Sequence, residues 1–406
     1  MTHPNLTWGR TLTAVGFAAI AVIVAACSGT GTIPSALQAA PNAVQGHTPH
    51  PPYTFAFETV DAPPGDGNTR VTGIDERPDM ILGTTGSTRS TYNSLVAHTP
   101  SPSGGGYREF RPRSYPHAGG TYMSAMSSAF YQGGTVFSPP PNRHLQCTTC
   151  GVTYYGKGSG TGYGDGDHCG STPCQWTFVQ DPSEGTGRCA VTEVLGMAYS
   201  NSVVGYYRTG GHDCGTQAFE AYLSPSGQSF ADFNVPGADP YTTRATSLNE
   251  KGDAVGTALF DGVTKGWYYV DASYCTRLAA PKSTATYFLG INWEDQIVGY
   301  YVDRSQVTHG FILLNPASSG RVWETVDAPA ADNYTVVSDI NTHHYITGWY
   351  RALHGRMRGF VGTCTNCEKG QDERRGGDPQ AAPDGQTAPE SEGARCTTKG
   401  MGRQRL

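Results

Sequence analysis

The chain has 406 residues, among them 53 glycines and 23 tyrosines, and Lys, Arg, Asp and Glu together supply only 15 % of it. Since an average soluble domain has ~25 % charged residues, this composition favours a β-rich protein of the extracellular type over a helical one. The net charge of −6 is small for this length and no basic stripe is present, so we predict no nucleic-acid binding.

An apolar segment, TLTAVGFAAIAVIVAA over residues 11–26, follows Arg10 at the amino terminus. It is short for a membrane span and has the length of a signal-peptide core. It ends in Val-Ala-Ala-Cys27, which resembles the lipobox of bacterial lipoproteins. The resemblance implies removal of residues 1–26 as a signal peptide and lipidation of Cys27, with the protein on the cell envelope, anchored to a membrane and facing outward. The alternative is an uncut anchor helix with an incidental cysteine.

Two further segments lack the apolar residues of a packed domain. Residues 27–52 are rich in Ala, Pro, Thr and Gly, which predicts a flexible tether. Residues 368–406 contain few apolar side chains and are predicted to be a disordered tail, because they bury too little surface to offset their ordering entropy.

A repeat occupies residues 53–367 between these segments. The cadence GINWEDQIVGYY (290–301) returns as GMAYSNSVVGYY, SLNEKGDAVGTA and DINTHHYITGWY. An upstream element repeats too, since FETVDAP (57–63) returns as WETVDAP (323–329). The glycine that closes each cadence marks the period: Gly205, Gly256, Gly299 and Gly348, with Gly83 in an earlier repeat and Gly134 in a weaker one over 107–137. A Cys- and Gly-rich insertion, 138–175, follows the weak repeat.

Each period contains four short β-type runs separated by turn residues. A four-stranded unit of this length is typical of one β-propeller blade, whereas a helical repeat would show a 3.6-residue apolar spacing. Ile297 and Val298 are adjacent and apolar, so both faces of the sheet must be covered. We therefore predict an all-β propeller, with six four-stranded blades. We place the period-marking glycines near the crowded central axis. We expect the carboxy-terminal strand to complete the first blade, so that the first and last strands pair and close the ring; a different strand phasing, without this closure, is the alternative.

The cysteines fit an oxidising compartment, since ten remain once Cys27 is assigned to lipid. We predict disulfides rather than a zinc ribbon in the insertion. We also predict one disulfide within a single repeat, and a structural disulfide rather than a redox motif at the end of the domain. The candidate cysteines, in these three groups, are Cys147, Cys150, Cys169 and Cys174, then Cys189 and Cys214, then Cys364 and Cys367.

Few other residues indicate chemistry. Asp165, Asp167 and His168 in a Gly-rich loop are weak candidates for a calcium site, and a disulfide-tied turn is the alternative. The adjacent pair His343-His344 is expected to lie in a solvated turn rather than to bind a metal. Aromatic pairs after the marking glycines are expected to pack between blades, with a ligand-stacking ring as the alternative: Tyr206, Tyr207, Tyr300, Tyr301, Trp349 and Tyr350.

The stretch GINWEDQIVGYYVDRSQVTHGFILL followed by VWETVDAP resembles the bacterial extracellular HAF repeats. His309-Gly310-Phe311 carries the name-giving triplet in relaxed form, and other repeats have Lys265-Gly266-Trp267 and Arg358-Gly359-Phe360. The resemblance implies secretion and a propeller-like fold, and it brings no catalytic residues.

From these patterns we expect a cell-surface lipoprotein that acts as a non-catalytic binding or scaffolding propeller, without a cofactor, for a carbohydrate or peptide ligand. The alternative is a lyase or hydrolase that acts on extracellular polysaccharide or cell wall at the propeller centre. An enzyme predicts one or two non-repeated acid/base residues with shifted pKa in the central cavity, whereas a binder predicts aromatic and neutral polar groups.

Overall fold

The computed structural model describes residues 52–61, 68–75, 80–86, 93–98, 111–112, 120–128, 131–137, 148–155, 168–169, 172–173, 175–198, 201–211, 213–224, 226–270, 274–367 and 397–399. The predicted signal peptide, Cys27 and all but the last residue of the tether lie outside these ranges. The described part is almost wholly β-structure, with two short 3-10 helices, η2 (Gly187–Cys189) and η3 (Leu353–Gly355). The predicted all-β fold is confirmed.

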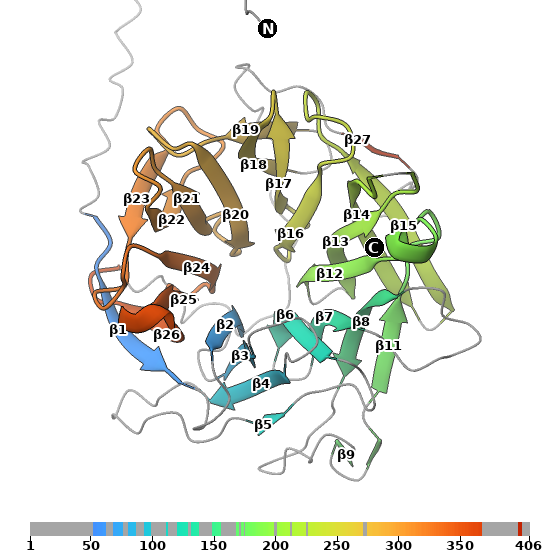
Figure 1. Cartoon of the computed structure of the whole chain (residues 1–406), viewed down its shortest axis with the longest axis horizontal. Coiled ribbons are helices and arrows are strands. Elements are labelled where there is room, and N and C mark those ends of the chain that lie inside the picture. Colours follow the sequence, from blue (N-terminus) through green and yellow to red (C-terminus); the bar gives the residue numbers. More distant parts are fainter. Residues whose placement is uncertain are drawn as a thin grey trace, which may run out of the picture. The chain divides into compact units, whose positions relative to one another are not determined.

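Small antiparallel sheets stand around a common centre, as Figure 1 shows, and form a β-propeller. We number the sheets from first to sixth in chain order. The first contains β2 (Thr69–Ile74), β3 (Met80–Thr85), β4 (Asn93–His98) and β5 (Arg111–Pro112). The second contains β6 (Gly120–Ser128), β7 (Tyr131–Phe137), β8 (Thr149–Tyr155) and β11 (Gln175–Val179). The third contains β12 (Thr192–Met197), β13 (Ser202–Arg208), β14 (Thr216–Ser224), β15 (Gly227–Asn234) and β27 (Thr397–Lys399).

In the remaining sheets the strands again follow the chain order from the centre outward, except that the outermost strand of the sixth sheet comes from the amino-terminal end. The fourth contains β16 (Arg244–Leu248), β17 (Ala254–Phe260), β18 (Val263–Val270) and β19 (Tyr274–Leu278). The fifth contains β20 (Ala285–Ile291), β21 (Ile297–Val302), β22 (Thr308–Leu314) and β23 (Val322–Val326). The sixth contains β24 (Thr335–Ile340), β25 (Tyr345–Arg351), β26 (Met357–Cys364) and β1 (Phe55–Val60), so the amino-terminal strand completes the last sheet.

Three details of the predicted architecture need correction. Five sheets have four strands, but the third has five, so the prediction of six four-stranded blades is wrong there. The fifth strand is β27, which pairs with the outer edge of β15; it comes from the segment predicted to be disordered, of which only residues 397–399 are described. The segment 138–175 is not wholly an insertion, because β8 within it is a strand of the second sheet. Its residues also include the small pair β9 (His168–Cys169) and β10 (Thr172–Pro173).

Ring closure follows the expected pairing of the first and last strands. β1 pairs with β26 from Phe55 opposite Cys364 to Val60 opposite Gly359. The blade that is completed differs from the prediction: the amino-terminal strand β1 joins the last sheet, and the carboxy-terminal strand does not join the first. The innermost strand of each sheet is the one that precedes the marking glycine. The strand that contains FETVDAP comes before this innermost strand, so it forms the outer edge of the preceding sheet in the ring.

The core lies between the sheets. Ile297 and Val298 are both fully buried, although they point to opposite faces of the fifth sheet. Separate apolar clusters join the third sheet to the fourth, the fourth to the fifth, and the fifth to the sixth. The expected burial of both faces of a blade is therefore confirmed.

The marking glycines lie on the second strand of every sheet, one strand away from the axis. Each pairs with the residue before a β-bulge on the inner strand, as Gly299 pairs with Phe288 and Gly348 with Val337. A Cβ atom on any of the six would lie within 3.0 Å of an inner-strand carbonyl oxygen. The bulge, rather than crowding at the axis, therefore excludes a side chain there.

Candidate ligand-binding pocket

The bulged residues of the inner strands line a small cavity of about 40 Å³ at the centre of the ring. Four of the six bear a hydroxyl group, which donates to the carbonyl oxygen before the bulge of the next sheet. The bonds run from Thr72 to Met123 (2.7 Å), from Ser124 to Val194 (2.7 Å), from Thr246 to Phe288 (2.8 Å) and from Ser338 to Val71 (2.8 Å). This small axial cavity is therefore bounded by contacts that hold the sheets together.

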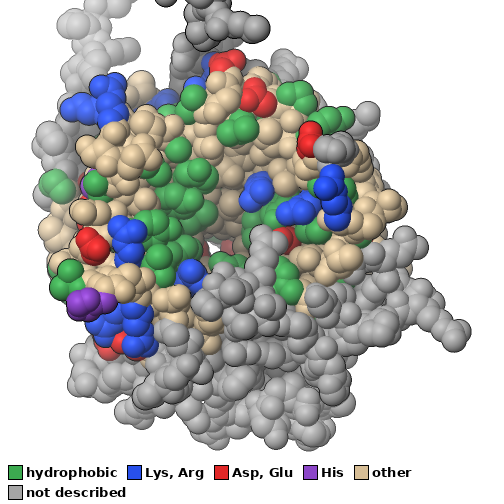
Figure 2. Space-filling view, in the orientation of Figure 1, with side chains coloured by type: hydrophobic (Ala, Val, Ile, Leu, Met, Phe, Trp, Pro, Cys, Tyr) green, Lys and Arg blue, Asp and Glu red, His purple; other side chains and the backbone are tan. Residues whose placement is uncertain are grey.

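The other two bulged residues are Leu195 and Leu289, in the third and fifth sheets. They cannot continue the hydroxyl pattern. Both, together with Thr246 between them, also line a second cavity of about 590 Å³. The larger cavity thus adjoins the axial one at the positions where the hydroxyl pattern is interrupted. Figure 2 shows that the middle of the ring is hollowed and that hydrophobic side chains gather beside the hollow.

The larger cavity, which we call the tyrosine pocket, contains a stacked aromatic pair. Tyr287 on β20 lies directly opposite Tyr300 on β21. Their ring centroids are 4.4 Å apart and the rings are inclined by only 10°. Both side chains are partly exposed and line the pocket. Burial and the neighbouring tyrosines raise the pKa of Tyr300, so its hydroxyl stays protonated. The pair therefore offers a flat, rigid and uncharged surface.

A guanidinium group shares the pocket with the tyrosines. Arg244 begins β16, is exposed, and lies over the buried ring of Tyr206 with its Cζ 4.6 Å from the ring centroid. Within the described ranges its guanidinium group makes no ion pair or hydrogen bond. The described residues that line the pocket include no Asp, Glu or His. The pocket therefore carries one positive charge without a neighbouring counter-charge on its wall.

Threonine hydroxyls supply the remaining polarity of the pocket. Five threonines line it: Thr216, Thr242, Thr246, Thr257 and Thr264. The Thr242 hydroxyl donates to the Asp239 carbonyl oxygen (2.8 Å) and accepts from the Leu259 amide (3.1 Å). Among the described residues, no hydrogen bond is made by the hydroxyls of Thr216, Thr257 or Thr264. These three groups are available to a ligand.

Tyr241 stands at the rim of the pocket in an unusual conformation. Its φ is +58° and its side chain is 62 % exposed. Its carbonyl oxygen accepts from the Thr216 amide at 2.7 Å, which fixes the backbone. The matching position in the sixth sheet is Asn333, with φ of +53° and the same kind of bond from Thr308. Asn tolerates this left-handed region well, whereas a bulky aromatic residue there is a strained outlier of the kind that collects at functional sites.

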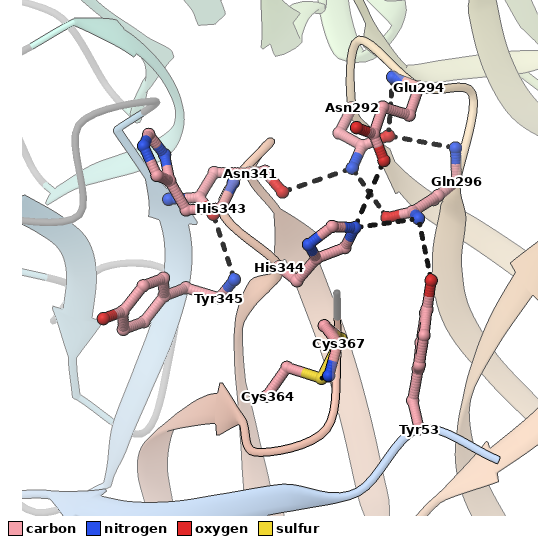
Figure 3. A network of polar contacts seen from close by, with 10 residues as sticks. All are labelled: Tyr53, Asn292, Glu294, Gln296, Asn341, His343, His344, Tyr345, Cys364 and Cys367. Carbon is pink, nitrogen blue, oxygen red and sulfur yellow. Dashed lines mark hydrogen bonds and ion pairs between the residues drawn. A yellow bond between two sulfur atoms is a disulfide. The ribbon is translucent and has the colours of Figure 1, made fainter. Parts of the chain in front are cut away.

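The turns at the far ends of the inner strands form a different network, shown in Figure 3. The side-chain oxygen of Asn292 accepts from the amides of Glu294 and Gln296, both at 3.0 Å, and its amide donates to the Asn341 carbonyl oxygen at 3.2 Å. Asn249 and Asn341 repeat this arrangement toward their own next sheets. This asparagine of the Gly-Ile-Asn cadence therefore caps a turn and joins two sheets.

His344 belongs to the same network. It is 7 % exposed, and its Nε2 lies 3.1 Å from Gln296 Nε2 and 3.2 Å from Glu294 Oε2. The expected solvated turn is therefore wrong for His344, because its ring packs under Tyr53, with centroids 5.8 Å apart; His343 is exposed. In the described part of the chain, no group of three or more His, Cys, Asp or Glu side chains could hold a metal ion.

Carboxyl groups with a raised pKa lie away from both cavities. Burial raises the pKa of Asp181 to about 6 and also raises that of Glu184. Thr192 donates to Glu184 at 2.7 Å, and the Asp181 amide donates to the same Thr192 hydroxyl at 3.1 Å. Neither acid lines the axial cavity or the tyrosine pocket. The enzyme hypothesis requires acids with a shifted pKa in the central cavity, and neither Asp181 nor Glu184 is among the described residues that line the two cavities.

The structure separates the predicted aromatic candidates. Tyr206, Tyr207 and Tyr350 are at least 96 % buried between sheets. Tyr301 stacks on His309, with centroids 5.1 Å apart, and does not line the pocket. Trp349 is partly buried and also lies outside it. Of the six predicted aromatic residues, only Tyr300 lines the pocket. Sequence reasoning missed Tyr287, Arg244 and Tyr241, which all precede the repeated asparagine of the cadence. The available signal was the segments RAT (244–246) and TYF (286–288), just before Asn249 and Asn292.

Two predicted disulfides are present in the described residues. Cys189 bonds Cys214, which lines the pocket, and Cys364 bonds Cys367. Cys150 is also disulfide-bonded, as predicted, and so is Cys275, which the predicted set omitted. Cys147, Cys174, Asp165 and Asp167 lie outside the described residues, and His168 and Cys169 form β9.

No protein-family model matches the sequence, and no curated protein matches it. Within the described ranges, no helix has the length and apolar character needed to cross a membrane.

Proposed function

We propose that the protein is a non-catalytic binding propeller and that its ligand occupies the tyrosine pocket. The observation that carries this proposal is the composition of the pocket wall: a stacked tyrosine pair, available threonine hydroxyls and one arginine without an ion pair, with no Asp, Glu or His among the described lining residues. Aromatic surfaces with a few placed polar groups are the usual equipment of a binding site. General acid–base chemistry most often uses His, Asp or Glu, which the described wall does not supply, and the raised pKa of Tyr300 disfavours its hydroxyl as a base.

A block of the pocket tests the proposal. The full chain should bind a member of a panel of glycans and peptides saturably, without forming product. Thr264→Trp, on the pocket wall, should abolish that binding, because the indole fills the cavity. Val263→Trp is the matched control, since Val263 is 42 % exposed and lies outside the pocket. Product formation by the wild type, or binding that both variants retain, would contradict the proposal.

We also propose that the chain is a lipoprotein of the cell envelope, held through acyl chains on Cys27. The lipobox resemblance of Val-Ala-Ala-Cys27 supports this location. Acyl chains contribute roughly 0.8 kcal/mol per buried CH₂, so more than one is needed for stable anchoring. Cys27→Ser should therefore abolish incorporation of labelled palmitate and move the protein out of the membrane fraction. Unchanged fractionation of Cys27→Ser would refute the anchor.

A further inference from the structure

The charge of the tyrosine pocket constrains the kind of ligand. Arg244 is exposed within the pocket, and its guanidinium group lies over the ring of Tyr206 and makes no ion pair among the described residues. A guanidinium group presents a planar fork of donors that matches a carboxylate. Because the ring of Tyr206 holds the guanidinium from one side, the fork is pre-organised before a ligand arrives. An anionic ligand group is the natural complement.

The aromatic pair indicates what else the ligand contains. Tyr287 and Tyr300 lie flat against each other and both line the same cavity as Arg244. Arg244 is near enough to Tyr300 to lower the tyrosine's pKa, against the larger effect of burial. A charged group on Arg244 and a flat ring against the tyrosines can thus belong to one ligand. The axial side of the same cavity is apolar, with Leu195 and Leu289.

The available hydroxyls favour a sugar over a peptide or an aromatic acid. Thr216, Thr257 and Thr264 offer groups that both donate and accept, which suits the hydroxyls of a pyranose ring. The apolar C–H face of such a ring stacks on tyrosine, while its edge carries the polar groups. A cavity of about 590 Å³ accommodates more than one sugar unit. Tyr241, exposed at the rim and held at positive φ, adds a second aromatic surface for a neighbouring unit.

We propose that the ligand of the tyrosine pocket is an acidic oligosaccharide, in which a uronate carboxylate pairs with Arg244 and a pyranose ring lies against the tyrosines. This inference rests on the proposed binding function. It adds the substrate class and assigns Arg244 as the residue that distinguishes acidic from neutral sugars.

The test compares charged and neutral forms of the same sugars on the full chain. The probes are oligomers of galacturonate, of mannuronate and of glucuronate with N-acetylglucosamine, each beside its carboxyl-reduced form. We expect at least one uronate oligomer to bind, with its reduced form binding at least tenfold more weakly. Arg244→Gln should weaken binding of the uronate form by roughly 10- to 100-fold, the range for a hydrogen bond to a charged group, and leave the reduced form unchanged.

Matched variants separate this effect from damage to the fold. Arg277→Gln removes an exposed arginine from the same sheet, one that lies over Phe260 at 5.7 Å and outside the pocket; it should not change binding. Tyr287→Ala should weaken charged and neutral forms alike, whereas Tyr222→Ala, which removes a tyrosine 40 % exposed on β14, should change neither.

The outcomes separate the two proposals. Binding of a neutral glycan or a peptide with no binding of any uronate oligomer would overturn the acidic-sugar inference and leave the binding function standing. Uronate binding that Arg244→Gln does not weaken would also overturn it. Failure of every glycan and peptide probe to bind would remove the binding function itself.

Discussion

Asn292 shows how one side chain serves two sheets. It is 1 % exposed and uses both ends of its amide. Its oxygen holds the turn of its own sheet, and its nitrogen reaches the Asn341 carbonyl oxygen of the next. Gln296 Oε1 accepts a further bond from the same nitrogen at 2.9 Å. A buried amide with these partners cannot be replaced by an apolar group without leaving donors unpaired.

We therefore expect Asn292→Ala to lower the free energy of unfolding by about 2–4 kcal/mol, because the buried amide of Gln296 and the partly buried amide of Glu294 lose their acceptor. The measurement is urea unfolding followed by tryptophan fluorescence. Asn234→Ala is the control, since Asn234 is exposed on β15 and makes no side-chain hydrogen bond among the described residues. An equal effect of the two substitutions would show that the hydrogen bonds of Asn292 between sheets do not contribute to the free energy of unfolding.

Asp181 gives a prediction about pH. Burial raises its pKa to about 6 in the folded chain, against an ordinary value of 3.8, and Asp232 adds to the rise while the bond from Ser183 opposes it. The folded state then binds the proton more tightly than the unfolded state, so this carboxyl makes stability fall as pH rises from about 4 to about 6. Asp181→Asn should flatten that decline in the melting temperature. Asp261→Asn, at an exposed carboxylate, should not. A decline of undiminished slope in Asp181→Asn would exclude Asp181 as its source.

Individual residues were only partly predictable from the sequence. Asn292 could be seen as part of a cadence, but its bonds to the next sheet depend on ring geometry that spacing does not contain. His309 was recognised as part of a triplet. Its ring Nδ1 lies 2.7 Å from Asp327 Oδ2, in the Val-Asp-Ala-Pro element, so the two repeated motifs are partners. Arg358 and Asp61 make the corresponding pair in the sixth sheet. Arg244 and Tyr287 were missed because their importance arises from a cavity between sheets.

At the scale of elements, the repeated glycines mark backbone contacts. Gly310 faces Val337 of the next sheet, and Gly359 faces Val71. In both cases the partner is the residue just before the inner-strand bulge. In the fifth and sixth repeats the two glycines thus serve different contacts, one within the sheet and one between sheets, whereas the third repeat has Ala218 at the second position. The sequence predicted the strands well because strand and turn residues alternate, but a bulge of one residue has no such signature.

The two disulfides should differ in their effect on stability. Cys189 and Cys214 are 25 residues apart, while Cys364 and Cys367 are 3 apart. On the chain-entropy model, the longer loop is worth about 3.5 kcal/mol and the shorter about 2 kcal/mol. Replacing both cysteines of each pair by serine should therefore lower the free energy of urea unfolding more for the first pair, measured without reductant. The reverse order would mean that the chain-entropy term does not control these bridges.

The whole molecule depends on closure of the ring. β1 and β26 pair over six residues, and Phe57 packs on Phe360 with ring centroids 5.2 Å apart. The closure is extended by Thr54 and Asn366, since the Thr54 amide donates to Asn366 Oδ1 at 2.7 Å. Among the described strands, the main contacts between sheets join neighbours in the ring, so the loss of one contact need not reach the opposite side. Stability in such repeated architectures is close to a sum of neighbour terms.

Deletion of Phe55–Val60 should therefore open the ring locally. β26 would lose its outer partner, and Val60, fully buried between the sixth and first sheets, would leave a gap beside Val71 and Val361. We expect hydrogen exchange measured by mass spectrometry to rise in β24–β26 and β2, while β16–β18 keep their protection. The exposed edge of β26 should also promote self-association. Ala56→Ser, at an exposed position on the same strand, should leave exchange unchanged. A uniform loss of protection across all sheets would instead mean that the ring unfolds as one cooperative unit, with closure supporting every sheet equally.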